Sequence, residues 1–328
     1  MSKKLIEVTN LKKYFPVTGG VLSRKVGDIK AVDGLSFHIN EGETFGLVGE
    51  SGCGKSTAGR TISHLHKATA GRVQFKDTVL FDVENKEALD KKSMRSLRRD
   101  IQMIFQDPFA SLDPRMNIGA IVSEGLIKHK IMDKHAALAR TKELLEICGL
   151  DGSNAAKYPH EFSGGQRQRI GIARSLALNP KFIICDEPTA ALDVSIQAQV
   201  LTLMQKLKEE MGLTYLFISH DLSLVRYFCD RLGIMYLGSF MEIGTSEQLF
   251  KSALHPYSQA LLSAVPRSHP SEKRERIILE GDVPSPANPP KGCKFHTRCP
   301  KALPVCSQKA PEMAEPEPGH RVWCHLVK

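Results

Sequence analysis

The chain has 328 residues and a formal net charge of +9, and its length suits one large domain or two modest ones. No apolar run approaches the roughly 20 residues of a membrane span, and the first residues lack the apolar region of a secretion signal. We therefore expect a soluble, cytosolic chain without a transmembrane segment of its own. The basic charge could suit nucleic acid or an anionic membrane, but its densest run, residues 91–99, is more typical of a solvated helix face.

The eight cysteines argue against a disulfide framework, because disulfides are rare in a reducing cytosol. Four are scattered along the chain and are expected in its core: Cys53, Cys148, Cys185 and Cys229. The other four gather near the C-terminal end: Cys293, Cys299, Cys306 and Cys324. Clustered cysteines favour metal ligation, so the second group is a candidate metal site.

The first third of the chain, to about residue 105, is predicted to be rich in β-strands. The candidate strands are residues 6–11, 31–39, 43–49 and 71–75. The third of them leads directly into a glycine-rich segment, GLVGESGCGKST, which fits the phosphate-loop pattern G-x-x-x-x-G-K-[ST].

In such a P-loop, glycines let backbone N–H groups face a phosphate, and the helix expected to begin near Lys55 adds the positive end of its dipole. Lys55 is expected to bind the β- and γ-phosphates of a nucleotide, and Ser56 to bind Mg²⁺. A glycine-rich turn without a nucleotide is the alternative, but glycines, lysine and serine all fall in register. The expected nucleotide contacts are Gly49, Ser51, Gly52, Gly54, Lys55, Ser56 and Thr57.

Between about residues 107 and 165 the apolar spacing becomes helical, without a convincing strand, which predicts an inserted helical subdomain. The segment FSGGQRQRIGIARSLAL follows, where Ser163, Gly164 and Gly165 precede a helix whose apolar residues are spaced for packing. This is a second helix N-terminus suited to an anion. The chain thus carries two predicted phosphate-binding helix starts.

A pair of acids follows the apolar strand 182–185 in FIICDEP. Parallel sheets bind ligands at the carboxyl ends of their strands, so we assign Asp186 to the Mg²⁺ shell and Glu187 to positioning or deprotonating the attacking water. Helix capping by the two acids is the alternative. Beyond them, FIICDE, TYLFIS and RLGIMYL alternate with helices, which predicts a parallel α/β sheet. An apolar stripe on the first of these helices is expected in the core: Ile196, Val200, Leu203 and Leu207.

Together these motifs resemble the ATP-binding cassette (ABC) family, whose signature L-S-G-G-Q has Phe162 in place of leucine here. In that family two cassettes face each other, and each signature caps the nucleotide on the partner's P-loop. The resemblance implies a dimer, with four signature residues contacting ATP: Ser163, Gly164, Gly165 and Gln166.

The resemblance also assigns residues outside the phosphate motifs. Gln106 matches the Q-loop glutamine, which senses Mg²⁺ and water and faces the membrane partner. His220, in FISHD, matches the switch histidine, which contacts the γ-phosphate and helps to hold Glu187.

Two further family positions can be matched. Asp193 matches the D-loop aspartate, although Ala191 replaces the commoner serine of that motif. Phe15 matches the aromatic residue that stacks on adenine, with Tyr14 as the alternative.

The expected fold class is an α/β P-loop ABC ATPase. It has a RecA-like parallel sheet core, antiparallel β segments and the helical subdomain at about 107–165, all within an ATPase domain of residues 1–254. Residues 255–328 would form a C-terminal extension joined by the polar linker 268–277.

The extension, with H-P-Y-x-x-A-L-L-x-A-x-P, resembles that of ATPase subunits from oligopeptide and dipeptide importers, and the likeness covers effectively the full length. LKKYFPV and the long SGGQ block are nearer to the F-type subunit.

The C-terminal cysteines have the spacing C-x5-C-x6-C-x17-C, which could close a tetrahedral zinc site or a [4Fe–4S] cluster. The extension lacks the C-x2-C knuckles of zinc ribbons, and the tails of the related importers can hold [4Fe–4S], so iron–sulfur is favoured over zinc. If zinc is bound, His296, His320 or His325 could replace a sulfur. Four thiols without metal remain a third interpretation. With either metal we expect a structural role.

The resemblance implies ATP-driven import of oligopeptides or dipeptides, in which two cassettes close over two ATP–Mg²⁺. The implied partners are two permease subunits, a second ABC ATPase in a heterodimer and, indirectly, an extracytoplasmic peptide-binding protein. The chain would lie peripherally on the cytoplasmic face of the inner membrane, without nucleic acid.

Nickel chelates or other small solutes are alternative cargoes. A soluble ABC ATPase of DNA repair or translation is the alternative of another class, but the chain has one cassette and no long heptad run. A P-loop kinase or GTPase would not need SGGQ.

Overall fold

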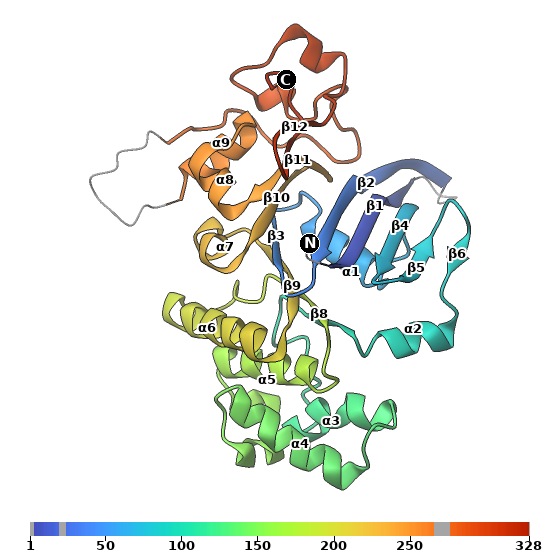
Figure 1. The fold of residues 1–328 in the computed structure, drawn as a ribbon, viewed down its shortest axis with the longest axis vertical. Helices are drawn as coiled ribbons and strands as arrows, with labels where there is room; N and C mark the ends of the chain where they lie inside the picture. The colour runs from blue at the N-terminus through green and yellow to red at the C-terminus, as the bar shows by residue number, and fades with distance from the viewer. Residues whose placement is uncertain (1–2, 20–23, 266–275, 328) are drawn as a thin grey trace. The chain divides into compact units, whose positions relative to one another are not determined.

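The computed structural model describes residues 3–19, 24–265 and 276–327, which form two compact units (Figure 1). The first unit consists chiefly of Leu89–Phe217, and the second of Lys4–Ile39, Glu43–Ala88 and the chain after Phe217. Residues 268–275 of the predicted linker lie outside the described residues. In the described part of the chain, every helix is too short or too polar to cross a bilayer.

The second unit contains an antiparallel sheet with the strand order β2-β1-β4-β5-β6. Its strands are β1 (Lys4–Gly19), β2 (Arg24–Asn40), β4 (Ala70–Phe75), β5 (Thr78–Asp82) and β6 (Glu87–Ala88). The buried residues Ile6 and Val8 of β1 lie opposite Phe75 and Val73 of β4, so their side chains share the apolar face. The sequence predicted β1, β2 and β4 as shorter strands and missed β5 and β6.

The same unit holds a mixed set of strands. β3 (Thr44–Val48) pairs in parallel with β10 (Arg231–Tyr236), and β10 pairs antiparallel with β11 (Ser239–Thr245). All five residues of β3 are buried, which explains why it is apolar after Thr44. The extension adds the antiparallel strands β13 (His320–Val322) and β12 (Ala314–Glu317) to the free side of β11. The extension therefore continues a sheet of the second unit.

Short helices complete the second unit. They are α1 (Lys55–Ile62), α7 (Leu222–Phe228), α8 (Ser246–Ser252), α9 (Pro256–Ser263), η3 (His296–Arg298) and η4 (Pro304–Ser307). The tyrosine of the H-P-Y motif is fully buried, and its proline is the first residue of α9, where a missing N–H costs nothing. His255 caps α9, because its Nδ1 accepts a hydrogen bond from the Tyr257 N–H at 3.0 Å. Burial lowers the pKa of His255 to about 4, so the cap is neutral.

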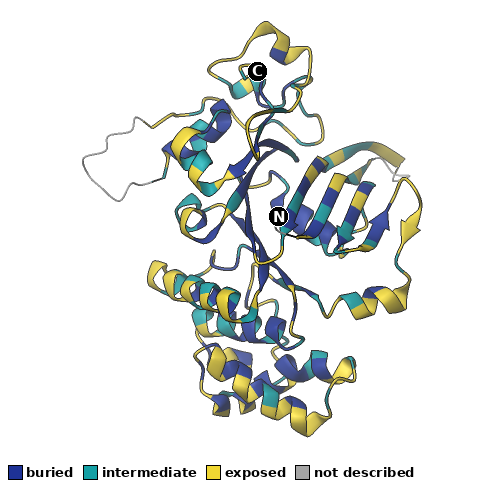
Figure 2. Cartoon of the chain, viewed as in Figure 1, coloured by how far each residue is buried: buried dark blue, intermediate teal, exposed yellow. Residues whose placement is uncertain are grey.

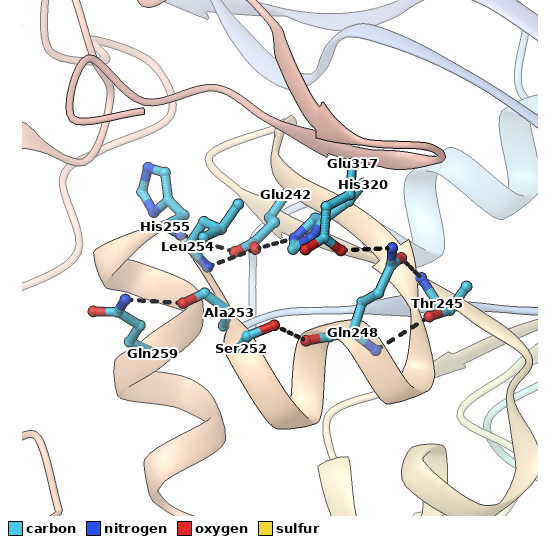
Figure 3. A network of polar contacts seen from close by, with 10 residues as sticks. All are labelled: Glu242, Thr245, Gln248, Ser252, Ala253, Leu254, His255, Gln259, Glu317 and His320. Atoms are coloured by element: carbon cyan, nitrogen blue, oxygen red, sulfur yellow. Dashed lines mark hydrogen bonds and ion pairs between the residues drawn. The ribbon is translucent and has the colours of Figure 1, made fainter. Parts of the chain in front are cut away.

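A buried carboxylate ties the extension to this region (Figure 3). Glu242 of β11 is fully buried and accepts hydrogen bonds from the N–H groups of Leu254, at 2.7 Å, and His255, at 3.0 Å. The Nε2 of His320, on β13, lies 2.7 Å from Glu242 Oε1. Because burying a carboxylate is costly unless it is hydrogen-bonded, this network holds α9 and the extension strand to one point of β11.

The first unit combines strands and helices. Its elements are α2 (Lys91–Leu97), β7 (Ile101–Ile104), α3 (Ile118–Lys128), α4 (Lys134–Ile147), η1 (Gly152–Ala156), η2 (Pro159–Glu161), α5 (Gly164–Leu176), β8 (Phe182–Asp186) and α6 (Val194–Met211). β7 and β8 pair in parallel. Asn117 and Asp133 cap α3 and α4 by accepting hydrogen bonds from Ala120 N and Ala136 N. β9 (Thr214–Ser219) follows, and the division between the units falls within it.

Burial separates the core of the first unit from its surface (Figure 2). β8 is buried at every position, whereas α6 buries only one stripe. Val200 and Leu207 lie in the core as predicted, together with Met204, but Ile196 and Leu203 are only half-buried. The four scattered cysteines are all buried, as predicted.

Candidate nucleotide-binding site

The P-loop lies between β3 and α1, and its glycines are required by its geometry. Gly49 has φ +152°, and a Cβ there would lie 2.3 Å from the carbonyl oxygen of Met235. Gly54 has φ +105°, and its Cβ would lie 1.9 Å from the carbonyl oxygen of Ala31. Such contacts exclude any side chain, so the curled loop can form only with glycine at both positions.

Lys55 is the first residue of α1, and only 4% of it is exposed. Its Nζ donates to the carbonyl oxygens of Gly49, at 2.8 Å, and Glu50, at 3.1 Å. The ammonium therefore lies inside the loop, where it can exchange a carbonyl for a phosphate oxygen. Ser56 and Thr57 lie in the first turn of α1 and are partly exposed, while Ser51 is exposed.

Two neighbouring aromatic residues of β1 differ in what they contact. The Tyr14 hydroxyl donates to Asp33 Oδ1 at 2.5 Å, and burial together with this carboxylate raises the pKa of Tyr14. Phe15 is partly exposed, with its ring edge-on to His66 at 5.7 Å and Lys13 Nζ 4.6 Å from its centre. Because Tyr14 is tied to Asp33, Phe15 is the better candidate for stacking on a base.

The predicted carboxylate pair ends β8 in the first unit. Asp186 is fully buried at the last position of the strand. Glu187 follows with φ +47°, a left-handed conformation that costs free energy in a residue with a side chain. Its Oε2 accepts a hydrogen bond of 2.9 Å from Gln106 Nε2. The structure thus joins two residues that the sequence placed 81 positions apart, in a backbone conformation often found where function requires strain.

The SGGQ segment begins α5 with a capping box. Ser163 Oγ accepts from the Gln166 N–H at 3.4 Å, and Gln166 Oε1 accepts from the Ser163 N–H at 3.0 Å. Phe162, which replaces the leucine of the family signature, is buried. Asp193 caps α6, and its carbonyl oxygen accepts from the N–H groups of Ile196 and Gln197.

The second signature glycine also has a packing role. A Cβ at Gly165 would lie 2.4 Å from Ile196 Cγ2, so this position lets α5 approach α6 closely. We expect Gly165→Ala to lower the free energy of unfolding by about 1–3 kcal/mol through overpacking. Chemical denaturation would measure it. Ile196→Ala should recover much of the loss in the double variant, and an unchanged stability of Gly165→Ala would contradict the packing role.

The other predicted site residues lie as follows. His220 is exposed directly after β9, in the second unit, and Asp221 beside it caps α7. Gln106, Asp186, Glu187, Asp193 and the SGGQ residues all belong to the first unit.

Sequence reasoning missed a group of residues around Glu50 of the P-loop. The Glu50 N–H donates to the Tyr257 hydroxyl at 3.1 Å, and its carboxylate is bound by both terminal nitrogens of Arg298. These partners lie 207 and 248 positions away along the chain. The H-P-Y motif was visible in the sequence, but no local pattern points from it to the P-loop.

A groove of about 700 Å³ lies in the first unit, beyond Gln106. It is lined by residues 109–116 together with Ile121, Glu124 and Arg174. Phe109 is 55% exposed there, and the guanidinium of Arg167 lies 4.0 Å from the centre of its ring. An exposed aromatic residue beside a groove is typical of a surface that binds another protein.

The four C-terminal cysteines lie near one another in the extension. Cys293, Cys306 and Cys324 are buried, and Cys299 is partly buried. Burial raises the pKa of the Cys293 thiol to about 11, with smaller contributions from the other three thiols. Across the described residues, however, no group of three or more His, Cys, Asp or Glu side chains is arranged to hold a metal ion. The thiols are suitable donors for zinc or iron, but this arrangement is not yet a ligand sphere.

The histidines considered as zinc ligands have other contacts. His320 lies against Glu242, as described above. His296 Nδ1 is 2.8 Å from the carbonyl oxygen of Cys293, and His325 Nε2 is 2.9 Å from that of Lys309. Each contact uses one ring nitrogen and leaves the other available, so both sulfur and histidine donors are present in the extension.

Comparison with known proteins shows the family to which the chain belongs. The ABC transporter family matches residues 32–190, and the C-terminal region of the oligopeptide/dipeptide transporter family matches residues 241–306. The chain is 56% identical to the oligopeptide transport ATP-binding protein AppF of Bacillus subtilis, across 98% of this chain and 97% of that protein. It is 49% identical to OppF of Escherichia coli, across 99% and 97%.

The fold is also similar to that of solved ATP-binding cassettes. The structure of the ATP-binding cassette MJ0796, a dimer in a post-hydrolysis state bound to ADP and Pi, matches with a TM-score of 0.64 and 30% identity. The match covers 74% of this chain and 99% of that one. The predicted α/β ABC ATPase fold, with a parallel core and an antiparallel sheet, is confirmed. The chain belongs to the ABC transporter family, among the oligopeptide transport ATP-binding proteins.

Proposed function

We propose that this chain is the ATP-hydrolysing subunit of an importer for oligopeptides or dipeptides, bound peripherally at the cytoplasmic face of the cell membrane. The observation that carries the proposal is full-length similarity to proteins named for oligopeptide transport, including the C-terminal region that ordinary cassettes lack. The start of the chain and its SGGQ block favour the F-type subunit.

ATP would be bound by the P-loop, with its base on Phe15 and its phosphates on the loop N–H groups and Lys55. Ser56, Asp186 and Gln106 would supply the oxygen ligands that Mg²⁺ prefers, and the ion would neutralise charge on the phosphates. Glu187 would orient the attacking water and accept its proton, held by Gln106 in the arrangement described above. His220 would contact the γ-phosphate.

The signature residues would complete the site of a partner cassette. Their helix start offers free backbone N–H groups and a positive dipole end to a phosphate. The dimer of the MJ0796 cassette is consistent with this arrangement. We infer a heterodimer with a second ABC ATPase, in which closure over two ATP changes the access of the membrane subunits and hydrolysis resets them.

Two permease subunits would bind the pair of ATPases, and one of them would contact the groove of this chain's first unit. The groove follows the Q-loop glutamine directly in sequence, so a contact there could be transmitted to Glu187 through Gln106. Phe109 offers an exposed apolar anchor at its edge. Cargo would reach the permeases from an extracytoplasmic peptide-binding protein and would not contact this chain.

Affinity purification of the tagged chain from gently solubilised native membranes would test this proposal. Recovery of two multi-span permeases and a second cassette ATPase, with loss of peptide uptake when the gene is deleted, is the expected result. If deletion abolished uptake of nickel chelates and not of peptides, the cargo would be a nickel chelate. Recovery only from the soluble fraction with ribosomes or nucleic acid would favour a soluble ATPase of translation or DNA repair.

We also propose that the four C-terminal cysteines hold a [4Fe–4S] cluster with a structural role. Support comes from four neighbouring thiols in an extension with little regular structure. Zinc is the alternative occupant.

Replacing Cys306 with serine is expected to reduce bound iron and acid-labile sulfide to near zero, because the cluster would lose a ligand. The measurement is elemental and sulfide analysis of chain purified without oxygen. Cys229→Ser, at a buried cysteine far along the sequence from the group, is the matched control and should keep its metal. If the unaltered chain contained stoichiometric zinc instead of iron, the site would be a zinc site. If the unaltered chain contained neither metal, both assignments would be wrong.

A further inference from the structure

We propose that the segment of residues 293–299, within the C-terminal extension, positions the P-loop through Arg298 and thereby sets the affinity for ATP. This inference rests on the proposed role of Lys55 in binding phosphate, but not on the identity of the cargo. It makes Arg298 a positioning residue that acts through Glu50.

All three polar parts of Glu50 are held. Its carbonyl oxygen accepts from Lys55, and its N–H donates to the Tyr257 hydroxyl, as described above. Its carboxylate receives Arg298 Nη1 at 2.8 Å and Nη2 at 3.2 Å. Two of these partners, Tyr257 and Arg298, belong to the C-terminal extension, and another is the lysine that is proposed to bind phosphate. Glu50 is therefore the single residue between the extension and Lys55, the proposed phosphate contact.

The Arg298–Glu50 pair is built to be rigid. Only 8% of the Arg298 side chain is exposed, and 27% of that of Glu50. Arg298 Nε also donates to the carbonyl oxygen of Gly281 at 3.1 Å, and its guanidinium lies 5.9 Å from the ring centre of Tyr236. An arginine side chain stays charged at any physiological pH, so the cation is always available to Glu50. A shielded, two-pronged pair of this kind is stronger and more directional than a surface ion pair.

An aromatic cluster fixes the segment behind this pair. The ring of Phe295, which is 1% exposed, lies 5.4 Å from that of Tyr236 and 5.2 Å from that of Tyr257. Tyr236 and Tyr257 are 4.8 Å apart. The same tyrosine that accepts from the Glu50 N–H therefore packs on the segment that carries Arg298. Such ring contacts resist small displacements because interiors are close-packed.

A second cation holds the other end of the segment. Lys294 Nζ donates to Asp33 Oδ2 at 2.8 Å, to Ser239 Oγ at 2.7 Å and to the Leu237 carbonyl oxygen at 2.9 Å. Burial would raise the pKa of Asp33, but the hydrogen bonds from Lys294 and Tyr14 outweigh it and lower that pKa. Asp33 thus links the segment to the residue beside Phe15. One end of the segment contacts the P-loop, and the other is linked through Asp33 to Tyr14, the neighbour of the proposed adenine contact.

Charge explains why this arrangement should affect ATP affinity. Glu50 places a carboxylate in a loop whose proposed ligand carries several negative charges, and an unpaired carboxylate there would repel the phosphates. Arg298 neutralises that charge and holds Glu50, whose carbonyl oxygen accepts a hydrogen bond from Lys55. Its loss should therefore weaken ATP binding more than it slows the chemical step.

The test measures ATP affinity of the purified full chain and, in the reconstituted transporter, the KM and kcat of ATP hydrolysis. For Arg298→Gln we expect ATP to bind about tenfold more weakly, equivalent to ~1.4 kcal/mol, with kcat within about twofold. Adding Glu50→Gln should restore most of the affinity, because it removes the exposed charge. Arg298→Lys, which keeps the charge but not the fork, should fall between.

Arg321→Gln is the matched control, because this arginine of the same extension pairs with Glu315 at 3.1 Å on the surface. It should bind ATP like the unaltered chain. Wild-type affinity in Arg298→Gln would overturn the proposal. So would a loss that Glu50→Gln fails to restore while the melting temperature falls, since that pattern indicates a purely structural anchor. A transporter with another cargo would leave the result unchanged, because the measurement concerns ATP alone.

Discussion

Replacing Glu187 with glutamine is expected to reduce the rate of ATP hydrolysis by about a thousandfold while ATP still binds. Glutamine has nearly the same shape but cannot accept the proton of the attacking water. The residue is held in a left-handed conformation at the end of a fully buried strand, and Gln106 contacts its carboxylate. Such precise positioning is needed for a group that aligns a water molecule, and it would serve little purpose for an ordinary surface carboxylate. Steady-state phosphate release and equilibrium ATP binding would be measured on the same preparation.

Glu210→Gln is the control for this prediction, since Glu210 is an exposed carboxylate on α6 that faces Lys206. It should hydrolyse ATP at the normal rate. Unaltered hydrolysis in Glu187→Gln would refute the role as a base. Loss of ATP binding together with hydrolysis would also contradict it, because the prediction separates the two.

Local motifs could be predicted from the sequence because their geometry is local. The P-loop glycines need positive φ or close contact with a carbonyl oxygen, and both requirements appear in the spacing of the motif. Ser163 and Gln166 form a capping box that the sequence S-x-x-Q already indicates. Strands β3 and β8 are buried at every residue, and the short apolar runs that make up most of each strand were sufficient to predict them.

Other parts of the fold could not be predicted, because their sequences carry no apolar pattern. β12 reads AEPE and has no buried residue, so nothing marks it as a strand before its partner β13 is known. β6 has only two residues, both exposed. Each forms by backbone pairing with a neighbour and not by burying a face, and neither could be told from a loop.

The contacts around Glu50 were hidden for a different reason. Arg298 looked like one charge among many in a basic chain, and its partner lies 248 positions away. A carboxylate within a phosphate-binding loop was nevertheless a visible anomaly, because it places negative charge where a polyphosphate is expected. Such an anomaly indicates that a cation is present, but only the fold shows which one.

Lys55 is expected to show the opposite behaviour to Glu187, with ATP binding itself lost. Lys55→Met keeps the length and apolar stem of the side chain but removes the ammonium that lies between the Gly49 and Glu50 carbonyl oxygens. Two charge-assisted contacts to phosphate disappear, so we expect affinity to fall about a hundredfold, equivalent to ~2.8 kcal/mol, and hydrolysis to fall with it. Lys67→Met, at an exposed lysine beyond the end of α1, is the matched control for fluorescent-ATP titration and should bind normally. If Lys55→Met bound ATP normally and lost only turnover, its ammonium would serve the transition state alone, and the phosphate-binding role would be wrong.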